Sequence, residues 1–236
     1  MKILAVDSSG LVASVALVED HKMVAEYTVN YKKTHSQTLL PMIAEITEMT
    51  ETDLSEIDAI AVAKGPGSFT GIRIGAATVK GLGLALNKPV IGVPTVEGLA
   101  MNLCGVSTLV CPLMDARRNQ VYTGIYRFRG NQIEVVKDQI PVGIEDIISA
   151  LNQIGEAVTF LGDGVAVYKE VIEQNIEVPY TFAPAHMNAQ RAAALGVRAF
   201  EYWENGLHVS ADEFEPEYLR LSQAERERLE KEKNEQ

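Results

Sequence analysis

The chain of 236 residues has only two cysteines, Cys104 and Cys111, and they do not form a Cys-x-x-Cys pair. Two thiols in a chain of this length do not supply a disulfide framework. No apolar run approaches the ~20 residues that a membrane-spanning helix needs. The first apolar run has four residues before Asp7, which is too short for a signal-peptide core. These absences predict a cytoplasmic protein with no membrane segment.

Histidine is also scarce, and its spacing excludes several kinds of chemistry. None of the four histidines forms a close pair of the His-x-x-x-His kind found in metal sites. They are His21, His35, His186 and His208. No Ser-His-Asp set can be assigned without an arbitrary choice of positions. We therefore expect no metal site, no cofactor and no catalytic residue.

Positive charge is in short supply. Lys and Arg number 21 against 32 Asp and Glu, which gives a formal net charge of −11 and a pI of about 4.9. Because neutralisation of phosphates dominates nucleic-acid affinity, so acidic a protein should bind RNA weakly by itself. The candidates for a local basic surface are Arg117-Arg118 and Arg127 with Arg129. A hydrophobic content of 47% is ample for a packed core.

The most informative stretch is residues 58–86. Residues 59–63 form a short apolar run typical of a buried strand. A turn rich in glycine and proline follows at 64–71, and we expect a helix over 70–86 capped by Ser68 or Thr70. Such a turn before a helix can bind phosphate, but it lacks the Gly-Lys-Ser/Thr of a P-loop. A tight turn built for packing is the other interpretation.

This expected helix contains Gly75, Gly81 and Gly83, each costing roughly 1 kcal/mol relative to alanine. Close approach of a second helix on its outer side would offset that cost. Small side chains form a stripe at Ala77, Gly81 and Ala85, spaced four residues apart. One face suits packing on a sheet: Ile74, Gly75, Thr78, Val79, Leu82 and Leu86. The opposite face is small and basic: Arg73, Ala77, Lys80 and Leu84.

The first hundred residues read as one mixed α/β unit. Strands are expected at 3–6, 12–18, 23–29, 59–63 and 90–93, with helices at about 34–49, 70–86 and 96–103. Thr34 or Ser36 can cap the first helix, whose apolar positions are Leu39, Leu40, Ile43 and Ile46. Pro41 should kink this helix or shift its start.

A second unit begins near residue 109 and repeats the order of the first. An apolar run ends at Asp115 as the first run ends at Asp7, and each is followed by a polar turn and a strand. Further strands are expected at 121–128, 133–136 and 158–161, with helices at 144–154, 165–172 and 189–203. We therefore divide the chain into units 1–103 and 104–221 and a charged tail, 222–236.

Five segments carry a family resemblance. They are 7–9 (DSS), 35–41 (HSQTLLP), 64–75 (KGPGSFTGIRIG), 80–82 (KGL) and 216–220 (PEYLR). Together they resemble the signature of the TsaB (YeaZ) family, the partner subunits of the bacterial machinery that makes threonylcarbamoyladenosine in tRNA. The resemblance implies two units of the actin/hexokinase/Hsp70-like (ASKHA) fold, the second degenerate. It also makes Asp7, Ser8, Ser9 and Asp115 remnants of a nucleotide site, because their turns lack the glycine that gives phosphate room.

The resemblance further implies a non-catalytic dimerisation subunit that binds and supports a TsaD-type paralogue, which carries the metal-binding histidines. A TsaE-type ATPase would join the wider complex, tRNA would bind indirectly through it, and the isolated chain would form a homodimer. The expected partner surface is Leu39, Leu40, Ile43, Arg73, Ala77, Lys80, Gly81 and Leu84. Two alternatives stay open: an ATP-dependent small-molecule kinase of the same superfamily and a peptidase.

Overall fold

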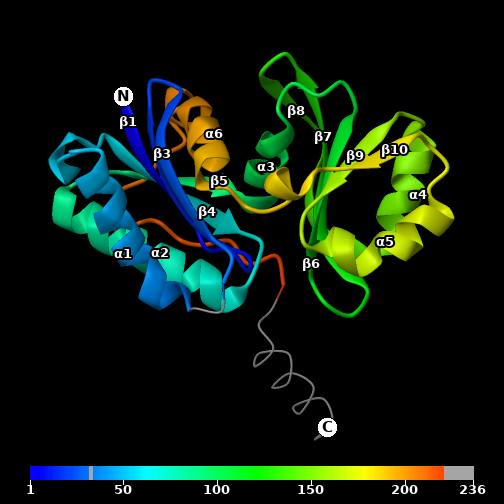
Figure 1. The fold of residues 1–236 in the computed structure, drawn as a ribbon, viewed down its shortest axis with the longest axis horizontal. Coiled ribbons are helices and arrows are strands. Elements are labelled where there is room, and N and C mark those ends of the chain that lie inside the picture. Colours follow the sequence, from blue (N-terminus) through cyan, green and yellow to red (C-terminus); the bar gives the residue numbers. More distant parts are fainter. Residues whose placement is uncertain (32–33, 221–236) are drawn as a thin grey trace, which may run out of the picture.

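The computed structural model describes residues 1–31 and 34–220, which form two lobes, each built on a five-stranded mixed sheet (Figure 1). The tail predicted at 222–236 lies outside these residues. The first sheet contains β1 (Lys2–Asp7), β2 (Ala13–Glu19), β3 (Lys22–Val29), β4 (Ala59–Gly65) and β5 (Val90–Pro94). The second contains β6 (Leu109–Asp115), β7 (Gln120–Arg129), β8 (Gln132–Gly143), β9 (Val158–Leu161) and β10 (Tyr180–Phe182).

The two sheets share one topology. The first has the order β3-β2-β1-β4-β5, and the second has the corresponding order β8-β7-β6-β9-β10. In each sheet the first three strands form an antiparallel meander, and a later strand joins in parallel beside the first. The internal repeat expected from the sequence is therefore confirmed as two related units.

Helices cover both faces of the first sheet. α1 (His35–Met49) and α2 (Phe69–Leu86) pack on one face, where Leu4 and Val6 of β1 join their core. α6 (Ala192–Glu204) packs on the other face, against Ile3 and Ala5. Because neighbouring side chains of a strand point to opposite faces, one apolar run serves both layers. The described chain contains no helix of the length and apolarity that crossing a membrane requires.

The second lobe is covered less fully. α4 (Ile144–Ile154) and α5 (Gly164–Asn175) pack on one face of its sheet. On the other face, α3 (Thr95–Ala100) and the 3₁₀ helix η2 (Met101–Leu103) join the two lobes. Short 3₁₀ turns complete the helices at η1 (Leu54–Glu56) and η3 (Ala185–Met187).

Most predicted elements are found, with four differences. β8 extends to Gly143 rather than ending at 136, and β10 was not predicted. α1 starts at His35 and includes Pro41, so the proline does not shift the helix start. The largest difference is α6, which packs on the first sheet and not within the second unit predicted at 104–221. The apolar face of α6, which includes Leu195 and Ala199, packs against β1 of the first sheet. The order of the elements along the chain does not predict this contact.

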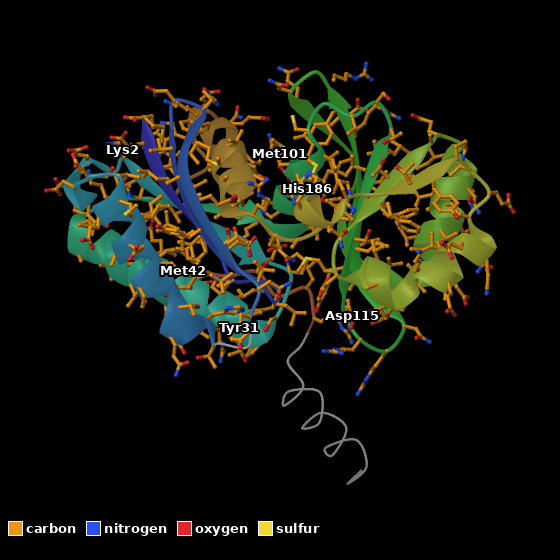
Figure 2. All side chains as sticks on the ribbon, viewed as in Figure 1. Lys2, Tyr31, Met42, Met101, Asp115 and His186 are labelled. Carbon is orange, nitrogen blue, oxygen red and sulfur yellow. The ribbon has the colours of Figure 1, made fainter. Side chains whose placement is uncertain are left out.

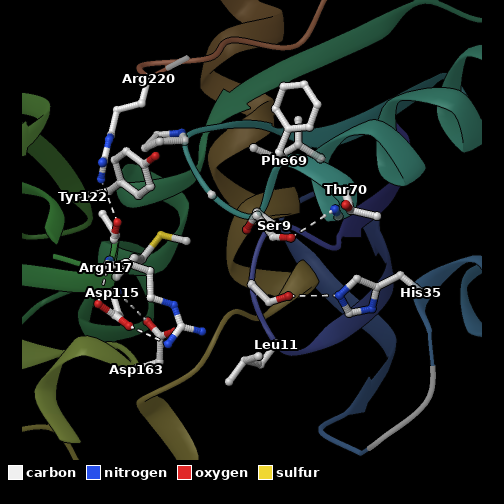
Figure 3. Close-up of a pocket in the computed structure, with 18 of the residues that line it drawn as sticks. Ser9, Leu11, His35, Phe69, Thr70, Asp115, Arg117, Tyr122, Asp163 and Arg220 are labelled. Atoms are coloured by element: carbon white, nitrogen blue, oxygen red, sulfur yellow. Dashed lines mark hydrogen bonds and ion pairs between the residues drawn. The ribbon is translucent and has the colours of Figure 1, made fainter. Parts of the chain in front are cut away.

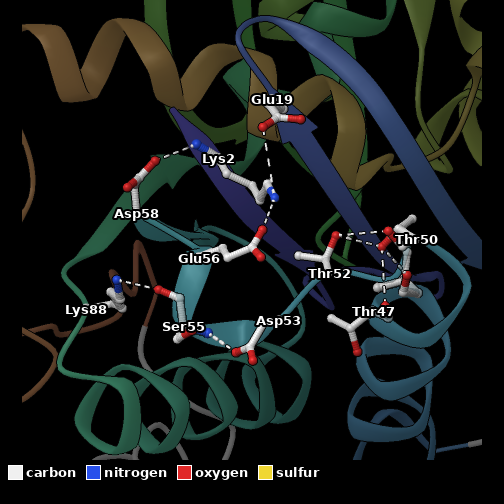
Figure 4. Close-up of polar contacts among 11 residues, drawn as sticks. Lys2, Glu19, Thr47, Thr50, Thr52, Asp53, Ser55, Glu56, Asp58 and Lys88 are labelled. Carbon is white, nitrogen blue, oxygen red and sulfur yellow. Dashed lines mark hydrogen bonds and ion pairs between the residues drawn. The ribbon is translucent and has the colours of Figure 1, made fainter.

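At one end of the first sheet, polar contacts hold the start of β1 to the loop before β4 (Figure 4). The Lys2 ammonium lies 2.7 Å from the Glu56 carboxylate, and the Lys2 backbone N–H donates to Asp58 at 2.7 Å. These groups are near the surface, so the ion pair contributes little to stability. The other end of β1 is the buried Asp7, and Asp115, at the end of β6, lies on the side of the second lobe that faces the first (Figure 2).

Candidate functional site

A cleft of about 790 Å³ separates the lobes. Ser9 and His35 line it on the first lobe together with the loop that leads into α2, and Asp115, Arg117 and Asp163 line it on the second (Figure 3). Residues 217–220 line it as well. The carboxyl ends of β1 and β6 thus meet at one cavity, which is where α/β folds place ligands.

Asp7 lies beneath this cleft, turned toward its own chain. Its carboxylate accepts hydrogen bonds from Ser9 N at 2.9 Å and Ser9 Oγ at 2.6 Å. Burial raises the pKa of Asp7 to about 6, although the two Ser9 bonds act in the opposite direction. The carboxylate therefore closes the turn rather than presenting an open ligand position to the cleft.

The backbone around Ser8 is packed against the start of α2. A Cβ on Gly71 would lie 2.1 Å from the Ser8 carbonyl oxygen, and one on Gly75 would lie 2.6 Å from Ser8 Oγ. Ser68 N also donates to Ser9 O at 2.7 Å. This packing explains Gly71 and Gly75 of the 64–75 motif and supports the packing interpretation of the turn. It also corrects the expectation for Gly75, whose close contact is inside the lobe.

Asp115 on the second lobe is also held by its neighbours. Its carboxylate accepts from Arg117 N at 2.9 Å and from Tyr168 OH at 3.2 Å. Asp163, which immediately precedes α5, accepts from Asp115 N at 3.2 Å. Burial raises the pKa of Asp163, and the nearby Asp115 charge adds to this. The two aspartates form one wall of the cleft.

The loop between β6 and β7 has an uncommon backbone. Arg117, Arg118 and Asn119 have φ values of 64°, 56° and 57°, so three consecutive non-glycine residues are left-handed. Such residues cost about 1–3 kcal/mol each and persist only where the surroundings fix them. No glycine stands at these three positions, so glycine placement did not predict the turn.

The outer face of α2 is open. Arg73, Ala77, Gly81 and Leu84 are exposed, and Lys80 is half-buried. A Cβ on Gly81 would meet no atom within 4 Å. Gly83 differs, because its Cβ would lie 2.6 Å from that of Ala211. Of the four α2 glycines, only Gly81 therefore has no packing role within the described chain.

The predicted partner residues on α1 need correction. Leu39 and Ile43 are only 1% and 3% exposed and belong to the core beneath α1, whereas Leu40 is 55% exposed. The helical repeat turns positions 39, 43 and 46 to the sheet and position 40 outward. Leu40 alone among the three is accessible to a partner.

Sequence reasoning assigned no role to the 216–220 motif, yet it lies at the cleft mouth. The Glu217 carboxylate pairs with Lys64 at 3.0 Å, and the Tyr218 ring packs on Phe69 with 4.7 Å between centroids. Arg220 reaches the second lobe, where Nη1 donates to Ala116 O at 2.7 Å.

Comparison with known proteins agrees with this architecture. Residues 22–228 match the family model of TsaD, tRNA N6-adenosine threonylcarbamoyltransferase. The tRNA threonylcarbamoyladenosine biosynthesis protein TsaB of Bacillus subtilis (strain 168) is 33% identical over 233 residues, covering 99% of this chain and all of the relative. The chain belongs to the TsaB (YeaZ) family. Escherichia coli (strain K12) TsaB is 38% identical over 135 residues, covering 56% of this chain and 58% of that protein.

Solved structures place this TsaB-family chain in the expected fold class. YeaZ from Pseudomonas aeruginosa superimposes with a TM-score of 0.81 at 29% identity, covering 92% of this chain and 99% of that one. A polyphosphate/ATP-glucomannokinase from Arthrobacter sp. strain KM matches with a TM-score of 0.52 at 11% identity, covering 86% of this chain and 99% of that one. The latter likeness concerns the fold alone, and it confirms the two-unit ASKHA architecture.

Proposed function

We propose that this chain is a non-catalytic dimerisation subunit of a cytoplasmic tRNA adenosine threonylcarbamoyltransferase complex. It binds and supports a TsaD-type paralogue, in which the catalysis takes place, during formation of N6-threonylcarbamoyladenosine. A TsaE-type ATPase belongs to the wider complex. In the absence of the paralogue, the same surface joins two copies of this chain.

The observation that carries the proposal is the open small-residue face of α2. Ala77, Gly81 and Ala85 leave the helix backbone accessible, and Gly81 has no packing role within the described chain. Leu40, 55% exposed, and Leu84, 60% exposed, add apolar surface on α1 and α2. A partner helix that packs against this face would approach the backbone closely and bury the two leucines.

A non-catalytic role is supported by contacts that already occupy two turns of this chain. The corresponding turns hold phosphates in active members of the superfamily. Backbone from the start of α2 packs against Ser8, and Asp7 already accepts two hydrogen bonds from Ser9. Asp115 accepts from Arg117 N and Tyr168 OH. A phosphate at either turn would have to displace these contacts. The net charge of −11 supports indirect binding of tRNA, with partners supplying most phosphate contacts.

Ala77→Trp tests the interface. A large ring on an exposed position should leave the fold intact and weaken both homodimer and heterodimer by at least about tenfold, or ~1.4 kcal/mol. Ala166→Trp, at an exposed position of α5 in the other lobe, is the matched control. Circular dichroism checks the fold, and light scattering with and without the TsaD-type partner checks assembly. Unchanged assembly of folded Ala77→Trp would place the interface elsewhere.

An ATP-dependent small-molecule kinase is the second candidate. The 790 Å³ cleft and the aspartates ending β1 and β6 favour it. Steady-state ATP turnover by the isolated chain with magnesium separates the two. We expect none above background. Turnover near ~1 per second that Asp7→Asn abolishes would favour the kinase.

A further inference from the structure

The segment 207–220 runs from the end of α6 along the first lobe to the mouth of the cleft (Figure 1). We propose that it is a strap: it is anchored on α2 and controls how the β6–β7 loop of the second lobe is held across the cleft. The proposal concerns the isolated chain and does not depend on the function proposed above.

The strap is fastened first to the edge of the sheet. Val209 and Val90 exchange two backbone hydrogen bonds, at 2.8 and 3.0 Å. Phe214 is 4% exposed and enters the core beneath α2. Glu217 N donates to Lys64 O at 2.7 Å, at the end of β4. The strap therefore follows a fixed path for most of its length.

α2 supplies a second set of contacts through its basic side chains. Lys80 Nζ donates to two strap carbonyls, Asp212 O at 2.9 Å and Phe214 O at 2.8 Å. Arg73 Nε donates to Tyr218 OH at 3.3 Å. Hydrogen bonds from a charged donor are stronger than neutral ones. Lys80 is thus the anchor that ties the middle of the strap to the helix.

The far end of the strap crosses to the second lobe. Arg220 Nη1 donates to Ala116 O at 2.7 Å. Ala116 immediately precedes the left-handed residues 117–119, and Ala116 N donates to Gln120 O at 2.9 Å across the same turn. Arg220 thus contributes one of the contacts that fix this costly backbone. Loosening the strap at Lys80 should loosen the turn at Ala116.

Hydrogen exchange of the isolated chain, followed by mass spectrometry at a concentration where the chain is monomeric, tests this coupling. Arg220→Ala should speed exchange of peptides covering 115–121 by roughly threefold to tenfold. Lys80→Met, which keeps the aliphatic stem, should speed exchange both in 207–220 and in 115–121. Arg129→Ala and Lys169→Met, which remove surface ion pairs to Glu134 and Glu173, are the matched controls and should change neither segment.

The decisive peptides are those of the β6–β7 loop. If Lys80→Met speeds exchange in 207–220 and leaves exchange in 115–121 as in the unaltered chain, loosening the strap does not loosen the β6–β7 loop, and the proposal fails. It fails equally if neither segment responds.

The Lys80→Met/Arg220→Ala double variant provides a second readout. Its effect on 115–121 should match that of Arg220→Ala alone, because both changes act through one connection. Fully additive effects would overturn the proposal. Unchanged exchange in β1 and β4 checks that each variant is folded.

Discussion

The carbonyl oxygen of Ser8 lies directly against Gly71, so that a Cβ at position 71 would be 2.1 Å from it. This single approach joins the turn after β1 to the first turn of α2. It explains why the motif that suggested a phosphate loop is instead a packing element. The consequences can be measured through stability, because the clash is with backbone that cannot rotate away.

Gly71→Ala should therefore destabilise the chain by about 3 kcal/mol. Gly81→Ala is the matched comparison, because its Cβ would meet open space. It should stabilise the monomer by up to about 1 kcal/mol through helix propensity. Denaturant unfolding at a concentration where the chain is monomeric gives both values. Equal effects of the two alanines would contradict the proposed difference between inner and outer glycines.

Asp7 should give the fold a pH dependence of definite sign. Its pKa is raised by burial from 3.8 to about 6, so the folded state binds more protons than the unfolded state between these values. The contribution of Asp7 to the free energy of unfolding therefore falls as pH rises from 4 to 6. Above pH 6 the buried carboxylate is charged, and the chain is less stable by roughly 3 kcal/mol than it is when Asp7 is protonated in both states.

Asp7→Asn cannot titrate and keeps an acceptor oxygen for Ser9. Relative to the unaltered chain, it should gain roughly 3 kcal/mol in unfolding free energy between pH 4 and pH 7. Urea unfolding across this range measures the difference. The charge of His35 lowers the pKa of Asp7, so the comparison is repeated in a His35→Gln background. A pH-independent difference in both backgrounds would show that Asp7 is not the titrating group.

Leu39 and Leu40 are neighbours in sequence with opposite expected roles. Leu39→Ala should cost 2–5 kcal/mol of stability, because its side chain fills the core. Leu40→Ala should change stability by less than about 0.5 kcal/mol and weaken binding of the TsaD-type partner. Thermal unfolding and titration calorimetry separate these outcomes. Loss of stability in Leu40→Ala without loss of binding would remove Leu40 from the interface.

The buried pair of Glu97 on α3 and Arg198 on α6 gives a fourth prediction. Their side chains hydrogen-bond at 6% and 9% exposure, and Tyr202 OH also donates to Glu97 at 3.1 Å. Arg198→Met should cost about 3–5 kcal/mol, because it leaves the Glu97 charge buried with only a hydroxyl partner. Adding Glu97→Gln should recover part of that loss. A double variant less stable than Arg198→Met would contradict this explanation.

Local patterns were sufficient to predict every strand except β10, and also the duplication. The apolar runs ending at Asp7 and Asp115 each begin a sheet, because buried strands need short continuous apolar segments. Spacing on α2 also placed Ala77 and Gly81 outside. On α1 the same reasoning failed for Leu39 and Ile43. Apolar spacing identifies a buried face but does not say whether the same chain or another one buries it.

Contacts between distant segments could not be predicted. Nothing near Gly75 in the sequence shows that Ser8 will pack against it, and nothing near Arg220 identifies Ala116 as its partner. The left-handed turn at 117–119 lacks glycine, so turn chemistry gave no signal. These features depend on tertiary contacts within and between the lobes, and only the structure reveals them.

The return of α6 to the first sheet has a consequence for biosynthesis. Ile3 and Ala5 are synthesised about 190 residues before Leu195 and Ala199, which cover them in the folded chain. At 5–20 residues per second, the interval is on the order of 10 to 40 seconds. Throughout that time one side of the nascent sheet has no native partner and is a natural target for chaperones. An N-terminal fragment ending near residue 103 lacks α6, so the apolar face of its sheet would stay exposed.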